Sequence, residues 1–155
     1  MTSHIGVGTV VPDFVLPDET GTERRLSGFL AGGPVVLFFY PAALTAGCTA
    51  EACHFRDLTA EFAAVGAQPV GVSGDAVARQ REFTDRHSLG FPLLSDAEGT
   101  VREQFGVRRG FSLAPTKRVT FVIDQDRRVL EIVRSELRMS AHADRALTTL
   151  RAHQG

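Results

Sequence analysis

The sequence predicts an α/β fold in which helices flank a mixed central β-sheet, with a β-hairpin added on the N-terminal side. Three features indicate this class. Residues 34–40 form an unbroken apolar run, which is typical of a central strand covered on both faces. Segments with helical apolar spacing then alternate with strand-like runs. Residues 118–133 contain two strand-like runs around a tight turn, which predicts an antiparallel pair near the end of the chain.

The first elements follow from turn residues and apolar spacing. Residues 14–26 hold two extended pieces around the polar turn 18–22, which predicts the hairpin. The central strand comes next, at 34–40. Residues 48–65 then switch to helical spacing, and Gly66 ends the predicted helix. One stripe of this helix is apolar and consists of Phe55, Leu58, Phe62 and Val65.

The remaining elements alternate in the same way. Asp75 is a candidate N-cap for one helix, and Ser140 is a candidate start for the last one. The predicted strands are 67–74, 91–96, 118–124 and 128–133, and the predicted helices are 75–87, 98–105 and 140–151. This order is the layout of a thioredoxin-like fold in a single domain, 1–155, although the pattern by itself leaves other α/β sandwiches open.

The composition is that of an ordinary globular protein. Of the 155 residues, 43% are hydrophobic and 23% are charged, and 17 basic and 18 acidic residues give a net charge of −1. This charge balance does not indicate a basic surface that would bind nucleic acid or an anionic membrane. Residues 1–14 lack the pattern of a secretory signal, and no apolar run reaches the about 20 residues of a membrane helix. We therefore expect a cytoplasmic protein.

Both cysteines, Cys48 and Cys53, lie just after the predicted central strand. In a reducing compartment, cysteines are more often catalytic, redox-sensing or metal-binding than permanently cross-linked. Cys48 opens the predicted helix, where free N–H groups and the helix dipole stabilise a thiolate, the nucleophilic form of the side chain. On location alone, the alternative is a small cysteine that only packs at a helix start.

The spacing of the cysteines excludes a disulfide within an intact helix. Five helical residues rise about 7.5 Å and turn about 140°, so the two Cα atoms would lie about 8.6 Å apart. A disulfide needs less than about 7 Å. Either the two sulfurs never bond, or the first turns of the helix unwind, and helix ends are the easiest part to melt. The spacing also differs from the Cys-x-x-Cys redox motif.

A metal site is not favoured by the positions of the histidines. A structural zinc site needs four ligands, and only His54 lies next to a cysteine. The other histidines are scattered along the chain, at His4, His87, His142 and His153. A Cys–His pair of the protease type stays open, without local support.

The residues around Cys48 carry a resemblance to a known family. The chain resembles the active-site signature of the peroxiredoxins in the pattern Tyr40-Pro41-x-x-x-Thr45-x-x-Cys48-x-x-Glu51. With the second cysteine, the stretch YPAALTAGCTAEACHFRD is similar to the PrxQ subgroup, also called bacterioferritin comigratory protein. The likeness covers nearly the whole chain, since five further stretches occur in the family's order: PDFVLPDETGT, VGVSGD, FPLLSD, FGV and RVTFVID. In its general sequence character the chain is most similar to actinobacterial members of the family.

The resemblance implies a thiol peroxidase and gives roles to named residues. Cys48 would attack the O–O bond of hydrogen peroxide or an organic hydroperoxide and become a sulfenic acid. Thr45 maps to the hydroxyl that binds the peroxide, with an ordinary loop or cap threonine as the alternative. Pro41 maps to the residue that shields the sulfur, with a simple strand terminator as the alternative. Arg118 maps to the arginine that stabilises the thiolate and polarises the peroxide, with an ordinary surface arginine as the alternative and Lys117 as a weaker candidate.

Glu51 is expected to orient Arg118. On a helical wheel Glu51 lies about 300° from Cys48, inside the apolar stripe, and a carboxylate on a buried face needs a cationic partner. The alternative is a first-turn glutamate that only suits the helix dipole. Ala46 stands where the subgroup commonly has proline, which bears on loop unfolding but removes no reacting group.

Cys53 would be the resolving cysteine under the same resemblance. It would form an intramolecular disulfide with Cys48, which a thioredoxin- or glutaredoxin-like protein then reduces. The wheel puts Cys53 at about 140°, outside the apolar stripe, where its sulfur can swing out. The resemblance also implies a monomer and no metal, flavin or haem, because sulfur carries the redox change. The alternative is a packed Cys53, which would leave Cys48 dependent on an external thiol.

Two other functions stay open at this point. One is a thioredoxin-like redox sensor without peroxidase turnover, and the other is a disulfide oxidoreductase, which the cysteine spacing and the lack of tryptophan disfavour. Phe39 and Tyr40 are expected to wall the site, with Phe91 and Phe111 as further candidates, although most of the 11 phenylalanines belong in the core.

Overall fold

A mixed five-stranded sheet forms the centre of the computed structural model, which describes residues 5–108 and 116–154. The strand order is β5-β4-β3-β6-β7. β3 pairs in parallel with β4 and antiparallel with β6, which confirms the predicted mixed sheet. The strands are β3 (Val35–Phe39), β4 (Gln68–Ser73), β5 (Leu93–Ser95), β6 (Val119–Ile123) and β7 (Val129–Arg134).

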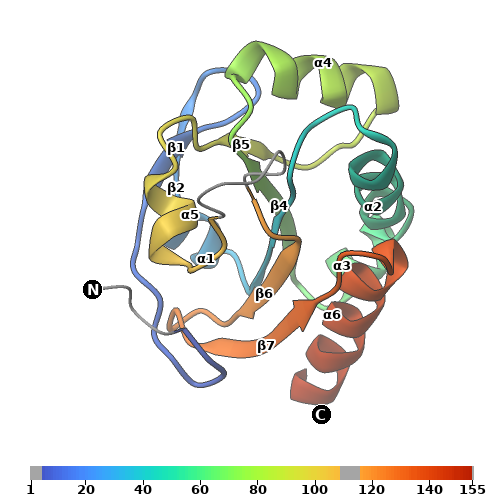
Figure 1. Ribbon diagram of the computed structural model, residues 1–155. Coiled ribbons are helices and arrows are strands. Elements are labelled where there is room, and N and C mark those ends of the chain that lie inside the picture. Colours follow the sequence, from blue (N-terminus) through green and yellow to red (C-terminus); the bar gives the residue numbers. More distant parts are fainter. Residues whose placement is uncertain (1–4, 109–115, 155) are drawn as a thin grey trace.

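Helices cover both faces of this sheet (Figure 1). One face carries α2 (Ala46–Asp57), α3 (Thr59–Ala64), α4 (Val77–His87) and α6 (Met139–Gln154). The other face carries α1 (Leu26–Leu30), α5 (Thr100–Gln104) and the predicted hairpin, made of β1 (Val15–Pro17) and β2 (Glu23–Arg25). Over the described residues, no helix has both the length and the apolarity that a bilayer crossing requires.

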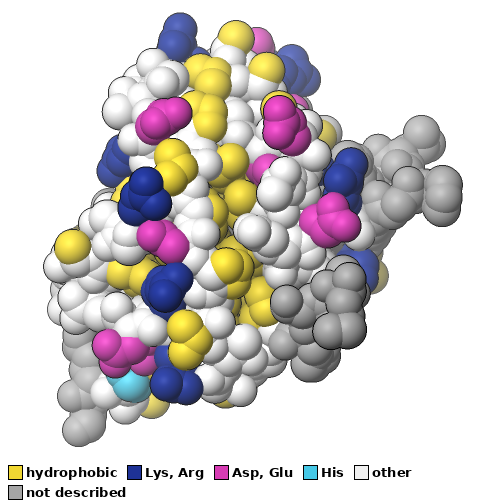
Figure 2. Space-filling model, turned by 90° about the vertical axis from the view of Figure 1, so that its left-hand side faces the viewer, with side chains coloured by type: hydrophobic (Ala, Val, Ile, Leu, Met, Phe, Trp, Pro, Cys, Tyr) yellow, Lys and Arg dark blue, Asp and Glu magenta, His cyan; other side chains and the backbone are white. Residues whose placement is uncertain are grey.

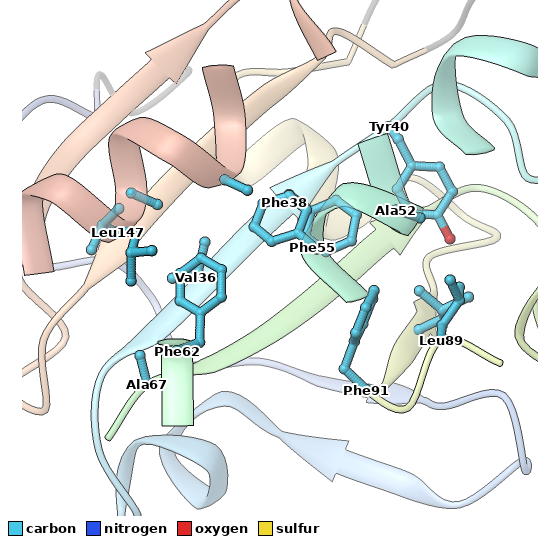
Figure 3. Packing of buried hydrophobic residues seen from close by; sticks show 14 of the residues in the cluster. Val36, Phe38, Tyr40, Ala52, Phe55, Phe62, Ala67, Leu89, Phe91 and Leu147 are labelled. Atoms are coloured by element: carbon cyan, nitrogen blue, oxygen red, sulfur yellow. The ribbon is translucent and has the colours of Figure 1, made fainter. Parts of the chain in front are cut away.

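The alternation of side chains along β3 divides the core in two. All five residues of the strand are buried. Because successive side chains point to opposite faces, Val36 and Phe38 enter the core under α2 and α6, whereas Leu37 and Phe39 enter the core under α1 and α5. Phe38 stacks on Phe55 of α2, with ring centroids 4.2 Å apart (Figure 3). This stack fixes the C-terminal half of α2 to the sheet.

The structure corrects the predicted helices in three places. The short helix α1 was not predicted, because five residues are too few to show a helical period. The predicted helix 48–65 begins two residues earlier, at Ala46, and is divided at Leu58, whose φ and ψ of −101° and 14° interrupt the helix. The N-cap residue of helix α4 is Ala76 and not Asp75, and no side chain caps this helix. The carboxylate of Asp75 has other partners, which belong to the site described below.

Asp18 closes the turn of the β1–β2 hairpin. Its carboxylate accepts hydrogen bonds from Thr20, Thr22 and the guanidinium of Arg24. Burial opposes ionisation, but these hydrogen bonds outweigh it and lower the pKa of Asp18 below its ordinary value of 3.8. The carboxylate therefore stabilises the fold fully above that ordinary value, and this contribution is lost as the pH falls through the lowered native pKa.

We expect Asp18→Ala to lower the free energy of unfolding by about 1–3 kcal/mol at pH 7. The difference between variant and parent should shrink in acid, because the parent then loses the same hydrogen bonds. Urea denaturation at pH 7 and at pH 2.5 measures both values. Asp126→Ala, at an exposed turn residue, is the control. A difference for Asp18→Ala that is equal at both pH values would contradict the prediction.

The face that carries β1 and α5 has a shallow apolar hollow. Figure 2 shows apolar side chains in a band between charged ones on this side of the molecule. The hollow measures about 480 Å³ and lies between β1 and the segment that leads from β5 into α5. None of the site residues predicted from the sequence lines it. The candidate active site lies on the opposite face of the sheet.

Candidate active site

Cys48 lies in the first turn of α2 and is 1% exposed. The first helical bond described for this helix runs from the Thr49 N–H to the Thr45 carbonyl, at 2.8 Å. The N–H groups of the first turn before Thr49, including that of Cys48, therefore have no acceptor within the helix. The prediction that the sulfur lies where a helix favours negative charge is confirmed, with the helix start displaced to Ala46.

Arg118 brings a positive charge to this sulfur. It directly precedes β6, is 6% exposed, and donates from Nη2 to the Cys48 Sγ at 3.4 Å and from Nη1 to the Glu51 Oε1 at 2.5 Å. A Cβ at Gly47 would lie 3.2 Å from Nη2, so the close approach of the guanidinium favours glycine there. The predicted meeting of Cys48, Glu51 and Arg118 is confirmed, although 67 and 70 residues separate the partners along the chain.

Glu51 is fully buried on α2, as the helical wheel predicts. Burial raises the pKa of Glu51 to about 8, against the opposing attraction of Arg118. Burial lowers the pKa of Arg118, but the adjacent Glu51 and Cys48 more than offset this and raise it overall. The raised pKa of Glu51 favours its protonated form near neutral pH, while Arg118 keeps its charge. The positive charge that faces the sulfur is then not cancelled by the carboxyl group.

His142 lies behind Glu51 and was missed by the sequence reasoning. It is fully buried on α6, with Nδ1 2.7 Å from the Thr120 Oγ1 and 3.6 Å from the Glu51 Oε2. Its Nε2 lies 2.8 Å from the Ser135 carbonyl oxygen. Burial lowers the pKa of His142. The signal was present in the sequence, because the i+4 and i+8 positions on the same face of the helix are apolar, at Ala146 and Leu150.

The loop between β3 and α2 carries Pro41 and Thr45. Pro41 is half-buried at the start of this loop, and Thr45 is exposed at its end, as the N-cap of α2. The Thr45 hydroxyl donates to the Ala42 carbonyl at 2.8 Å, so it bonds within the loop and not to the Cys48–Arg118 pair. Leu44 has a φ of +66°, in the left-handed region that a bulky side chain rarely adopts.

Asp75 ties this loop to the rest of the site, which explains why it does not cap α4. Its Oδ2 accepts from the Ala43 N–H at 2.7 Å and from the Ser73 hydroxyl at 2.6 Å. Gln80 extends the network, because its Nε2 donates to the Ser73 Oγ and its Oε1 accepts from the Tyr40 hydroxyl. The sequence showed Asp75 only as a helix-start residue, since a contact with a loop 32 positions away leaves no local pattern.

The aromatic side chains predicted to wall the site divide between the two cores. Tyr40 belongs to the same core as Cys48, and so does Phe91 (Figure 3). Phe39 was predicted wrongly, because it points to the opposite face of the sheet. Phe111 lies outside the described residues. Lys117, the weaker candidate beside Arg118, is exposed.

Cys53 lies in the same uninterrupted helix as Cys48, and both thiols are free. It is half-buried and packs against the core, as in the alternative of a packed Cys53, although the wheel places it outside the apolar stripe of α2. A helical wheel describes α2 alone, whereas α2 also packs against α6. The next residue, His54, bonds to Asp144 of α6 at 2.7 Å. Across residues 5–108 and 116–154, no three His, Cys, Asp or Glu side chains are grouped to hold a metal ion.

Comparison with known proteins identifies the family of this fold and site. Residues 7–132 match the AhpC/TSA family, and the chain belongs to that family. It is therefore a peroxiredoxin, an oxidoreductase with thiol peroxidase activity, and its fold is thioredoxin-like. This membership favours a thiol peroxidase over the two other functions that the sequence left open.

Individual relatives place the chain near the PrxQ and bacterioferritin comigratory proteins. It is 62% identical over 147 residues to a putative peroxiredoxin of Mycobacterium tuberculosis, covering 94% of this chain and 96% of that one. It is 37% identical to the chloroplastic peroxiredoxin Q of Oryza sativa subsp. japonica, covering 96% and 68%. Among solved structures, it matches peroxidoxin BcpB from M. tuberculosis with a TM-score of 0.93, at 61% identity and 96% and 98% coverage. It matches Xanthomonas campestris peroxiredoxin Q with a TM-score of 0.84, at 31% identity and 92% coverage of both chains.

Proposed function

We propose that Cys48 is the peroxidatic sulfur of a single catalytic domain, 1–155, that reduces hydrogen peroxide and organic hydroperoxides. The observation that supports this most directly is the guanidinium of Arg118, which lies 3.4 Å from the sulfur and is held from behind by Glu51. A fixed positive charge at this position favours the thiolate and stabilises the negative charge that develops on the leaving oxygen.

In the first step the Cys48 thiolate attacks the distal oxygen of ROOH. The S–O bond forms as the O–O bond breaks, the sulfur is oxidised to a sulfenic acid, and the leaving alkoxide takes a proton to give ROH. Arg118 stabilises the departing oxygen, and the Thr45 hydroxyl, once released from Ala42, binds the peroxide. Pro41 shields the sulfur from bulk water.

In the second step Cys53 resolves the sulfenic acid. Its sulfur forms the S–S bond to Cys48, and the sulfenic oxygen leaves as water with the thiol proton. Because both residues lie in the continuous helix α2, the first turns of the helix must unwind before the sulfurs can meet. The cycle is then that of an atypical two-cysteine peroxiredoxin, whose disulfide lies within one chain.

A thioredoxin- or glutaredoxin-like dithiol closes the cycle. It is oxidised to its own disulfide as it returns Cys48 and Cys53 to thiols. Since one chain holds both sulfurs, a monomer suffices, and a reducing compartment such as the cytoplasm supplies the dithiol. Sulfur carries both electrons, so the cycle uses no metal, flavin or haem.

The test compares two serine variants in a peroxide-consumption assay. We expect Cys48→Ser to abolish consumption, and Cys53→Ser to retain one fast turnover per chain without forming a disulfide. Mass spectrometry after one equivalent of peroxide should show that the parent has lost two hydrogens and carries a 48–53 linkage. If Cys48→Ser consumes peroxide at the parental rate, the assignment of the reacting sulfur is wrong.

A further inference from the structure

The imidazole of His142 has a defined tautomer in this structure. Its Nε2 lies 2.8 Å from the Ser135 carbonyl oxygen, and a carbonyl only accepts hydrogen bonds, so Nε2 carries a hydrogen. In a neutral ring the lone pair is then on Nδ1. The Thr120 hydroxyl, 2.7 Å away, donates to this lone pair. Nδ1 is thus a buried basic atom that faces the interior of the site.

Glu51 presents an unsatisfied oxygen to the same atom. Its Oε1 accepts from Arg118, whereas its Oε2 has no hydrogen-bond partner among the described residues and lies 3.6 Å from the His142 Nδ1. Both side chains are 0% exposed. A buried carboxylate oxygen without a partner is costly, so a proton at this place is favourable on either atom.

We propose that Glu51 and His142 together hold one proton, which keeps the pair neutral and leaves the positive charge of Arg118 to the Cys48 sulfur. In one form the proton is on the Glu51 Oε2 and His142 is neutral. In the other, that O–H bond is broken and an N–H bond is formed at Nδ1, giving a carboxylate and an imidazolium. The net charge is the same in both forms. The inference rests on the proposed role of Cys48, and His142 is a positioning residue that acts through Glu51 and Arg118.

The charged groups around the pair define the pH range of this state. Arg118 of the β6 side, Glu136 of the β7–α6 connection and Arg145 of α6 all act on His142, and Glu136 also acts on Glu51. Burial raises the pKa of Glu51 to about 8 and lowers that of His142, so the pair keeps one proton around neutral pH. Loss of that proton above this range leaves a carboxylate that cancels the charge of Arg118.

The imidazole therefore has a predictable effect on the sulfur. A second site for the shared proton, on a ring nitrogen 3.6 Å from the Glu51 Oε2, favours the protonated pair. Removing Nδ1 lets Glu51 ionise at lower pH. The new carboxylate competes for Arg118, and Cys48 then ionises at higher pH.

The experiment measures the alkylation of Cys48 by iodoacetamide against pH, without peroxide, in a Cys53→Ser background so that one sulfur reacts. We expect His142→Asn to raise the pH of half-maximal alkylation by on the order of half to one pH unit. Glu51→Gln mimics the protonated carboxyl and provides a background in which this side chain cannot ionise. In the Glu51→Gln background, His142→Asn should add no further shift. His54→Asn, at the half-buried histidine that bonds Asp144 between α2 and α6, is the control and should have no effect.

Two outcomes would overturn the proposal. The first is an unchanged pH of half-maximal alkylation in a folded His142→Asn variant. The second is a shift caused by His142→Asn that is equal with and without Glu51→Gln, because His142 would then have a purely structural role. Should the variant fail to fold, ¹⁵N NMR of the histidine rings decides with His142 intact. We expect the Nε2–H tautomer, and a signal change near pH 8 that disappears in Glu51→Gln; a change that persists there overturns the inference. Because alkylation needs no peroxide, these results are separate from the peroxidase test of Cys48→Ser.

Discussion

Replacing Arg118 with methionine is expected to slow the reaction of Cys48 with hydrogen peroxide by about 100- to 1000-fold, the loss that follows when a preorganised donor to a developing oxyanion is removed. The variant loses the guanidinium that lies 3.4 Å from the sulfur and so loses stabilisation of both the thiolate and the leaving oxygen. Single-turnover stopped-flow measurement in a Cys53→Ser background isolates this step from disulfide formation.

Two neighbouring variants make this result specific. Lys117→Met removes an exposed positive charge from the adjacent residue and should leave the rate unchanged. Arg118→Lys keeps a charge but cannot bond Cys48 and Glu51 from one planar fork, so its rate should fall between those of the parent and Arg118→Met. Circular dichroism checks that each variant is folded. A folded Arg118→Met variant that reacts within threefold of the parent would contradict the proposed role.

Truncating Phe55 to alanine is expected to cost about 3–5 kcal/mol of unfolding free energy. Phe55 is 0% exposed, stacks on Phe38 at 4.2 Å and lies 5.8 Å from the ring of Phe62 (Figure 3). The cavity left behind would lie between α2 and the sheet, where both helix and strand are fixed by other contacts. Urea denaturation measures the loss.

The same variant also tests the anchoring of α2. With its C-terminal half loosened, the helix should unwind more readily, so disulfide formation after oxidation of Cys48 should become faster. Phe29→Ala, at a half-buried phenylalanine on the opposite face of the sheet, is the control and should cost less stability and leave the disulfide step unchanged. Equal losses in the two variants would show that the stack with Phe38 is not the main anchor.

The parts of the fold predicted from sequence are those with a strong local pattern. The apolar run 34–40 predicted a strand covered on both faces, and residues 35–39 of it form β3. The turn around Asp18 and the one at 125–127 marked the two hairpins. The break at Leu58 had no such pattern, because an apolar stripe continues across a short interruption of the helix. The five residues of α1 were too few to show a period.

The site was predictable where chemistry and spacing coincide. Cys48 was found because a helix start favours a thiolate, and Glu51 because a carboxylate on an apolar stripe needs a cationic partner. Arg118 was found from the resemblance to the family. Asp75 and His142 were not predicted as site residues, because each acts through contacts between elements distant in the chain. His142 did break an apolar face of α6, so the argument applied to Glu51 would have found it as well.

The left-handed backbone of Leu44 bears on the redox chemistry of the chain. This conformation costs a residue with a Cβ roughly 1–2 kcal/mol, and the chain adopts it with both thiols reduced. In the proposed cycle, forming the disulfide unwinds the adjoining turn and releases that strain. For a two-electron couple, 1–2 kcal/mol corresponds to roughly 20–40 mV. Release of this strain on oxidation would make the reduction potential more negative by that amount, so the partner dithiol would have to be correspondingly more reducing.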